Sequence, residues 1–279
     1  MATNLVDVYT SDGRYLCALG GFAEPVIVSV TQSRADALAV SISGGAGDTK
    51  RALASVRRML GTELDLSKFH RHAQATPWLA PLARSLRALE PPRYPALFEA
   101  CANAIVFQQV SLHAASAIMR RLILALSTKV ERECVSLTAF PSVEGFLGAD
   151  DAVIRAAGLS AGKLATLRRA GEAIATGAIS EAMLEEQSSA DAGLLLRGIK
   201  GIGPWTVALI LLRGLGRLDV FPGNDSSVAA NLALVAGERV EAGPVVEMLG
   251  SQRGMLYFFL LLTRLEASGE IGRTSDVAR

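Results

Sequence analysis

The sequence has few cysteines and none of the spacings that bind metals. Cys17, Cys101 and Cys134 are the three in a chain of 279 residues, and no two of them lie close together in sequence. This excludes a zinc ribbon and a four-cysteine iron–sulfur cluster. It also predicts a protein of a reducing compartment, without structural disulfides.

Long hydrophobic runs and an excess of charge are lacking as well. The longest apolar stretches, VALILL and LYFFLLLT, are far short of the roughly 20 residues that a membrane helix needs. The first residues do not have the basic-then-apolar order of a signal peptide. A net charge of +1 predicts no general attraction to polyanions, so any nucleic-acid binding would depend on a local site. We therefore expect a soluble cytoplasmic protein that does not interact with membranes.

What is present divides the chain into two parts. The first fifty residues alternate between apolar and polar, with Asp-Gly and Gly-Gly turns, a pattern typical of antiparallel strands. Residues 48–61 then predict an amphipathic helix, with Asp48 as its N-cap and Gly61 as its terminator. Three prolines between positions 91 and 95 prevent a helix from continuing. We place a domain boundary there, with an N-terminal α+β domain over residues 1–88.

The second part, residues 89–279, has helical periodicity and predicts an all-α domain. One amphipathic run extends from Phe98 to Leu126. Further helices are predicted at 142–147, 150–157, 161–176, 180–187, 190–198, 204–214, 226–236 and 242–262. The predicted fold class is therefore α+β, a small antiparallel sheet domain with helices followed by an all-α domain.

The segment Leu194–Leu212 predicts a helix, a tight turn and a second helix. Gly201 and Gly203 allow positive φ and leave the backbone amides of the turn uncovered. Pro204 suits the first position of the second helix, where its missing donor is no loss. Bare amides at a helix start can bind an anion such as a phosphate. The alternative is an αα-hairpin whose glycines serve packing only.

This segment resembles the helix–hairpin–helix of the DNA glycosylase superfamily. The hairpin reads GIGPWT over residues 201–206, and Asp225 follows twenty positions after Trp205. Residues 48–61, 98–118 and 158–177 extend the likeness over almost the whole chain, and it is greatest to 3-methyladenine DNA glycosylase II. The resemblance implies a helix–hairpin–helix glycosylase domain and a nucleoid-associated, monomeric protein of bacterial type. Its partner would be double-stranded DNA that contains damaged bases.

The resemblance implies that Asp225 is the catalytic residue. Such enzymes extrude a damaged nucleotide into a pocket and cleave the bond between base and sugar. This cleavage builds positive charge on the sugar, and a carboxylate in a poorly hydrated wall stabilises that charge or orients the attacking water. The alternative is that Asp225 only caps the helix predicted at 226–236.

Trp205 predicts a monofunctional enzyme. Members of the superfamily that also break the DNA strand have a lysine at this position, which forms a Schiff base with the sugar. With tryptophan there, the expected product is an abasic site. An aromatic face also suits a cationic alkylated base. The alternative is a tryptophan that packs in the core.

Five further residues belong to the predicted site. Gly201, Gly203 and Thr206 of the hairpin are predicted to contact the DNA backbone. Gln108 and Gln109 are adjacent amides in an apolar run, and the superfamily has at the position of Gln109 a side chain that fills the gap left by the extruded nucleotide. The alternative is that one of the two amides satisfies buried backbone groups.

Tyr257 is predicted to line the pocket, although an aromatic stripe of this kind also suits a core helix. His70, His72 and His113 have no carboxylate or cysteine neighbours at ligand spacing, so no metal site is expected. No cofactor is expected either, apart from a monovalent cation that the hairpin would hold, as relatives do.

The leading hypothesis is the excision of alkylated purines such as 3-methyladenine. A glycosylase for an oxidised or deaminated base and a non-catalytic DNA-binding protein stay open as alternatives.

Overall fold

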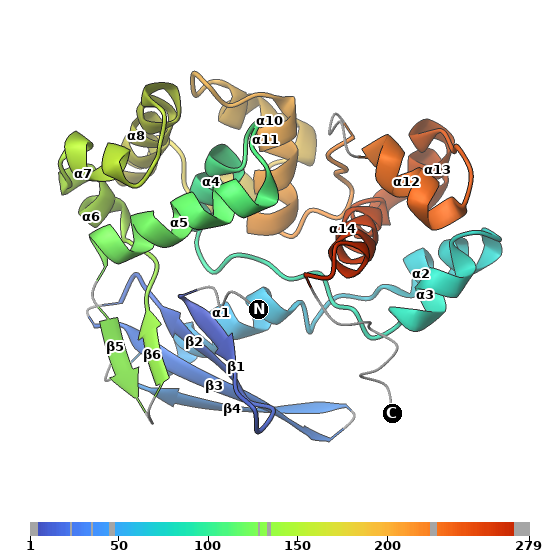
Figure 1. Cartoon of the computed structure of the whole chain (residues 1–279), viewed down its shortest axis with the longest axis horizontal. Coiled ribbons are helices and arrows are strands. Elements are labelled where there is room, and N and C mark those ends of the chain that lie inside the picture. Colours follow the sequence, from blue (N-terminus) through green and yellow to red (C-terminus); the bar gives the residue numbers. More distant parts are fainter. Residues whose placement is uncertain are drawn as a thin grey trace.

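The computed structural model describes residues 5–22, 24–34, 36–44, 48–127, 129–132, 135–223 and 228–270. A small sheet lies on one side of the molecule, and helices form the rest of it (Figure 1). This arrangement confirms the predicted α+β class.

The N-terminal sheet has four antiparallel strands in sequence order. They are β1 (Asp7–Tyr9), β2 (Tyr15–Leu19), β3 (Val26–Arg34) and β4 (Ala37–Ser43). Because side chains alternate between the two faces of a strand, Cys17 and Leu19 pack against helix α1 (Thr49–Leu60) on one face. Helix α1 ends as predicted at Gly61, where φ is +67°. Asp48 occupies the N-cap position, but its side chain makes no capping hydrogen bond.

A hairpin from the second part of the chain covers the other face of the sheet. It consists of β5 (Lys129–Arg132) and β6 (Val135–Thr138). Leu137 on β6 packs with Leu16 and Ile27 of the sheet, and the amide of Thr138 donates to the carbonyl of Leu5. The helical periodicity of residues 89–279 does not predict this hairpin, because its apolar side chains face a distant part of the chain.

The helices follow the predicted order. They are α4 (Leu97–Val106), α5 (Leu112–Leu126), α6 (Val143–Gly148), α7 (Asp151–Ala156), α8 (Ala161–Ala175), α9 (Glu181–Glu186), α10 (Ser189–Arg197), α11 (Pro204–Leu209), α12 (Val228–Ala236), α13 (Ala242–Leu249) and α14 (Met255–Ala267). A π-helical segment, Ile210–Gly214, continues α11, and a short 3₁₀ turn, Gly250–Gln252, follows α13.

Two segments that were predicted as single helices are broken. The run from Phe98 to Leu126 is interrupted between α4 and α5, where Gln109 has a φ of +53°. The range 242–262 is interrupted between α13 and α14, where Gly250 has a φ of +57°. Gly254 packs closely on Leu212: a Cβ added to Gly254 would lie 2.6 Å from the Leu212 side chain. Tertiary contacts and left-handed backbone thus end helices that apolar periodicity alone would continue.

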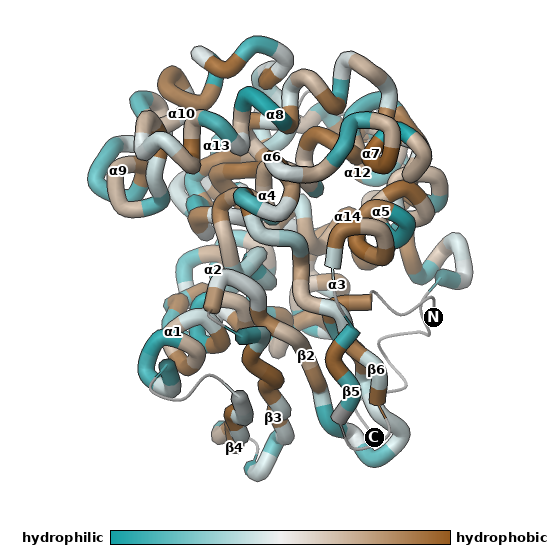
Figure 2. Tube along the Cα trace, turned by 90° about the vertical axis from the view of Figure 1, so that its left-hand side faces the viewer, coloured by the Kyte–Doolittle hydropathy of each residue, from teal (hydrophilic) through white to brown (hydrophobic). Residues whose placement is uncertain are grey.

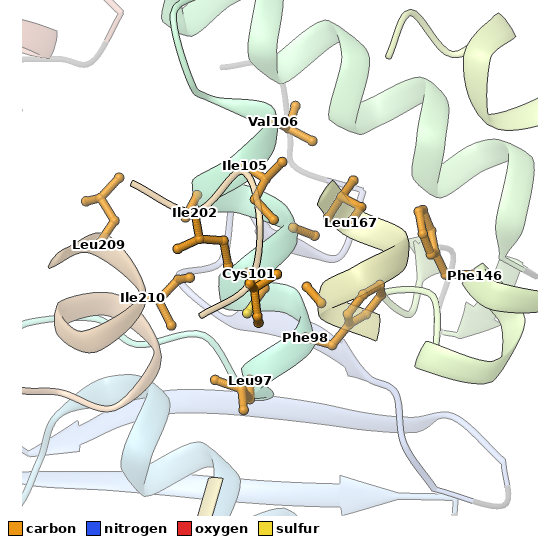
Figure 3. Close-up of a cluster of buried hydrophobic side chains, with 14 of the residues drawn as sticks. Leu97, Phe98, Cys101, Ile105, Val106, Phe146, Leu167, Ile202, Leu209 and Ile210 are labelled. Atoms are coloured by element: carbon orange, nitrogen blue, oxygen red, sulfur yellow. The ribbon is translucent and has the colours of Figure 1, made fainter. Parts of the chain in front are cut away.

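The main core lies where α4, α6, α8 and α11 meet. Figure 3 shows Phe98 and Ile105 of α4 together with Phe146 of α6, Leu167 of α8 and Ile202 of the hairpin turn. Ile202 lies beside α4 in this cluster and is buried. The hairpin is therefore anchored in the main core by its central side chain.

A second core joins residues 66–86 to the C-terminal helices. Helices α2 (Ser67–Ala75) and α3 (Ala80–Ser85) pack with α12, α13 and α14. The ring of Phe69 meets that of Phe259 edge to face, with 4.9 Å between the centroids. A domain boundary near residue 88 stays a prediction, and these contacts tie residues 66–86 to the C-terminal helices.

Figure 2 shows hydrophilic and hydrophobic residues mixed along the helical part of the chain, as expected where many helices bury only one face. Within the described ranges, no single helix is long and apolar enough to span a membrane. Helices α13 and α14 pass that test only when taken together, and they are bent by 119°. Packing explains the apolar sequence of α14, since Met255 and Phe259 are fully buried in the second core.

Candidate functional site

The two glycines of the hairpin have different roles. Gly201 has a φ of +103°, and an added Cβ would lie 2.0 Å from the hydroxyl oxygen of Thr166 on α8. Gly203 has an ordinary extended backbone, with φ −95° and ψ 177°, and an added Cβ would meet nothing within 4 Å. Of the two glycines, which both allow a positive φ, only Gly201 adopts one. Gly201 allows the turn to approach α8, whereas Gly203 leaves the outer surface open.

The polar groups of the hairpin turn divide into engaged carbonyls and open amides. Arg169 Nη1 donates to the carbonyl of Lys200 at 3.1 Å, and Gln108 Nε2 donates to the carbonyl of Gly201 at 3.2 Å. The amides of Gly201 and Gly203 donate to no acceptor among the described residues. Such amides in front of a helix start can bind an anion.

The turn between α4 and α5 is bound to the hairpin by one of the two glutamines. Gln108 Nε2 also donates to the hydroxyl of Thr206, at 2.7 Å. The Thr206 side chain is buried, so its hydroxyl serves this bond and not the molecular surface. Gln109 is exposed and has left-handed backbone. Gln108 thus satisfies backbone and buried groups, and Gln109 is the glutamine presented outward.

A lysine supports the same turn from the other side. Lys163, near the start of α8, donates from Nζ to the carbonyl of Val106 at 2.7 Å. This carbonyl lies at the C-terminal end of α4, where an ammonium group is favourable. Burial lowers the pKa of Lys163. Helix α8 therefore braces both elements of the site, the turn through Lys163 and the hairpin through Thr166.

These elements line a cleft of about 780 Å³. On one side are the α4–α5 turn and the hairpin, and on the other are α12 and α14. Both Trp205 and Tyr257 line it while half-buried against the core. The lining residues in the described ranges are Phe107, Gln108, Gln109, Val110, Ser111, Leu112, Gly201, Gly203, Pro204, Trp205, Thr206, Phe221, Val228, Asn231, Tyr257, Leu260, Leu261 and Arg264. The volume is within the range of sites for small ligands.

The cleft thus brings together all the predicted site residues that the structure describes. Asp225 lies outside the described residues. Phe221 precedes Asp225 in the sequence and Val228 follows it, and both of these residues line the cleft. The catalytic role of Asp225 therefore stays a prediction.

Sequence reasoning missed the contribution of α14 beyond Tyr257. Leu260, Leu261 and Arg264 follow Tyr257 at spacings of three, four and seven, which place them on one helix face. Arg264 is the only charged residue among the described lining residues, and none of them is a lysine. The described residues contain no group of three or more His, Cys, Asp or Glu side chains that could hold a metal ion.

Known proteins resemble the chain in sequence. No protein-family model matches it. DNA-3-methyladenine glycosylase 1 of Schizosaccharomyces pombe is 32% identical over 146 residues, which are 52% of this chain and 58% of that protein. Matches to the curated relatives span 43–58% of their own length, about half of each.

Solved structures resemble the chain in fold. The 3-methyladenine DNA glycosylase of Archaeoglobus fulgidus has a TM-score of 0.79 at 23% identity, covering 93% of this chain and 90% of that one. The S. pombe 3-methyladenine DNA glycosylase in complex with abasic DNA has a TM-score of 0.60 at 23% identity, covering 75% of this chain and all of that one. These likenesses show that the chain shares the fold of these glycosylases.

Proposed function

We propose that this member of the helix–hairpin–helix DNA glycosylase superfamily is a monofunctional DNA glycosylase of base excision repair. It would hydrolyse the N-glycosidic bond of extruded alkylated purines such as 3-methyladenine and leave an abasic site. One observation carries the proposal, the cleft in which the hairpin, Gln109, Trp205 and Tyr257 meet. The names of its sequence relatives support the same chemistry.

In this proposal the cleft receives the extruded base, and the hairpin binds the DNA backbone. The aromatic faces of Trp205 and Tyr257 stack on the base and attract its positive charge. The exposed Gln109 fills the gap in the duplex. The open amides of Gly201 and Gly203 donate hydrogen bonds to a phosphate. Since the hydroxyl of Thr206 is engaged by Gln108, Thr206 contributes by holding the turn.

Asp225 is proposed as the catalytic carboxylate. As the bond between C1′ and the base nitrogen breaks, the base leaves with the electron pair and the sugar becomes cationic. A carboxylate nearby stabilises that cation and orients the water whose oxygen bonds to C1′. The proton of that water passes to the carboxylate or to solvent.

The absence of lyase activity is proposed from the lysines near the site. A Schiff base requires an amine at the sugar, and the described residues lining the cleft include no lysine. Lys163 is hydrogen-bonded to the carbonyl of Val106. Lys200 lies five positions before Trp205 and does not line the cleft. We further propose a cytoplasmic, monomeric enzyme acting on double-stranded DNA, with a monovalent cation as the only ion at the hairpin.

The test is an excision assay on duplexes that each carry a single lesion. The panel contains 3-methyladenine, 7-methylguanine, hypoxanthine, uracil and 8-oxoguanine, and free base is measured directly. Release of the methylated purines is the expected result, with strand breaks only after alkali and no protein–DNA adduct trapped by borohydride. Release of 8-oxoguanine alone would replace the proposed substrate. An efficiently trapped adduct would contradict monofunctional action.

A further inference from the structure

The face of helix α14 that lines the cleft has a positively charged residue in its last turn. Tyr257, Leu260 and Leu261 line the cleft with aromatic and aliphatic groups, and Arg264 continues the same face in the last turn. Leu260 is buried, whereas Arg264 is exposed. The guanidinium therefore lies at the rim of the cleft and not in its interior.

No acid of the described chain neutralises this arginine. Its side chain makes no hydrogen bond or ion pair with any described residue. The other described residues that line the cleft are uncharged. In a protein whose net charge is only +1, a guanidinium that pairs with no described residue, at the rim of a cleft whose other described lining residues are uncharged, is a local site for an anion.

We propose that Arg264 binds a phosphate of the DNA strand that carries the extruded nucleotide. This inference rests on the proposed function. An extruded nucleotide stays covalently attached on both sides, so its two flanking phosphates lie at the mouth of the cleft. The hairpin amides precede α11, whereas Arg264 is in the last turn of α14, and both the hairpin and Arg264 line the cleft. Figure 1 shows α14 beside α12 and apart from α10 and α11. The strand is thus held on both sides of the nucleotide that enters.

The chemistry of the two possible ligands favours phosphate over the base. A guanidinium offers a planar pair of donors that matches two phosphate oxygens. An alkylated purine of the proposed kind is itself cationic, so a guanidinium inside the cleft would repel it. An arginine at the rim avoids that repulsion and still meets the backbone outside.

The test is the salt dependence of DNA binding by Arg264→Gln and Arg264→Lys. Arg57→Gln on α1 is the matched control, because Arg57 is exposed far from the cleft and its loss changes the net charge equally. Dissociation constants are measured between 50 and 200 mM salt for an undamaged duplex and for an abasic one. Each phosphate contact contributes about 0.9 to the slope of log affinity against log salt.

Arg264→Gln is expected to reduce that slope by about 0.9 on both duplexes, and Arg264→Lys and the control are expected to keep it. An unchanged slope in Arg264→Gln overturns the inference, and so does a variant that changes only which lesions are excised, since the arginine would then contact the base. If Arg264→Gln changes only the thermal stability, Arg264 stabilises the C-terminal end of α14 and does not bind phosphate, which also overturns the inference. If the wild type binds DNA with the expected slope but excises no lesion, the proposed function fails and the phosphate contact stands.

Discussion

At the scale of single residues, the proposed catalysis depends on one carboxylate. Asp225→Asn is expected to lower the rate of base release by at least about 100-fold, because a charge opposite the developing cation is lost. Release of free base under single-turnover conditions measures it. Binding to an abasic duplex is expected to stay near the wild-type value.

Asp219→Asn is the matched control, since this nearby acid accepts a hydrogen bond from Ser189 and does not line the main cleft. Near-normal excision by Asp225→Asn would limit that residue to a helix cap.

The two hairpin glycines provide a second test at this scale. Gly203→Val introduces a branched side chain where the surface is open and the backbone is ordinary, so the variant is expected to fold normally. It would obstruct the amides and weaken binding to damaged and undamaged duplexes alike. Dissociation constants for both duplexes, together with Tm, check this.

Gly201→Val is expected instead to lower Tm, because Thr166 occupies the Cβ position and φ is positive. Weakened binding of Gly203→Val to damaged DNA alone would place the hairpin at the lesion and contradict the phosphate-binding role.

The motif and its spacing point to Trp205, Tyr257 and Gln109, and the structure places all three at one cleft; their roles stay predictions. The sequence does not show which hairpin glycine uses its conformational freedom, or that the Thr206 hydroxyl is engaged within the protein. Those features depend on contacts with Thr166 of α8 and with Gln108, which are distant in sequence.

At the scale of elements, the sequence predicts the ends of a helix well where an N-cap residue begins the helix. Ser142, Ser160, Ser180 and Ser188 each accept a hydrogen bond from an amide three residues on, as N-caps do. The predicted ranges between 142 and 198 agree with the structure to within one residue at each end. The break between α4 and α5 depends instead on a distant hairpin, so periodicity could not place it.

The hydrogen bond from Lys163 to the carbonyl of Val106, which supports the α4–α5 turn, can be tested. Lys163→Met removes the bond to Val106, which positions the turn that presents Gln109. We expect excision from duplex DNA to fall several-fold while excision from a single-stranded substrate changes little, since only a duplex has a gap to fill. Binding to undamaged duplex should stay near wild type.

The ratio of duplex to single-strand excision is the measurement, and Lys50→Met, which removes an exposed lysine of α1, is the control. An equal loss on both substrates would show that Lys163 only maintains the fold.

At the scale of the whole molecule, buried acids lie where the sheet meets the helices. Glu99 on α4 is only 6% exposed. Burial raises its pKa to about 8; the Asp7 carboxylate of the sheet adds to the rise, and the Arg213 guanidinium opposes it. Burial also raises the pKa of Asp7, although Tyr15 donates a hydrogen bond to it. We therefore expect the stability of the contact between the two parts to depend on pH.

The sign follows from proton counts. In the unfolded chain Glu99 loses its proton near pH 4.5, whereas the folded chain keeps it to about pH 8. The folded state binds more protons between these values, so the free energy of unfolding falls as pH rises through this window. Glu99→Gln should be more stable than wild type at pH 8.5, by at most about 5 kcal/mol. The difference should narrow towards pH 4.5.

Denaturant unfolding across this pH range provides the measurement. The exposed Glu172→Gln should leave the pH dependence unchanged. Parallel curves for wild type and Glu99→Gln would mean that Glu99 does not titrate in this window.

The second core also affects how the chain is made. Phe69 on α2 packs on Phe259 on α14, and a ribosome adding about 5–20 residues per second needs roughly 10–40 s to pass from one to the other. During that interval α2 and α3 have no C-terminal helices to cover their apolar faces. A nascent chain stalled before α14 would therefore expose a hydrophobic surface that a chaperone can bind. Helix α14, which is synthesised after the other described helices, thus completes both the cleft and the burial of α2.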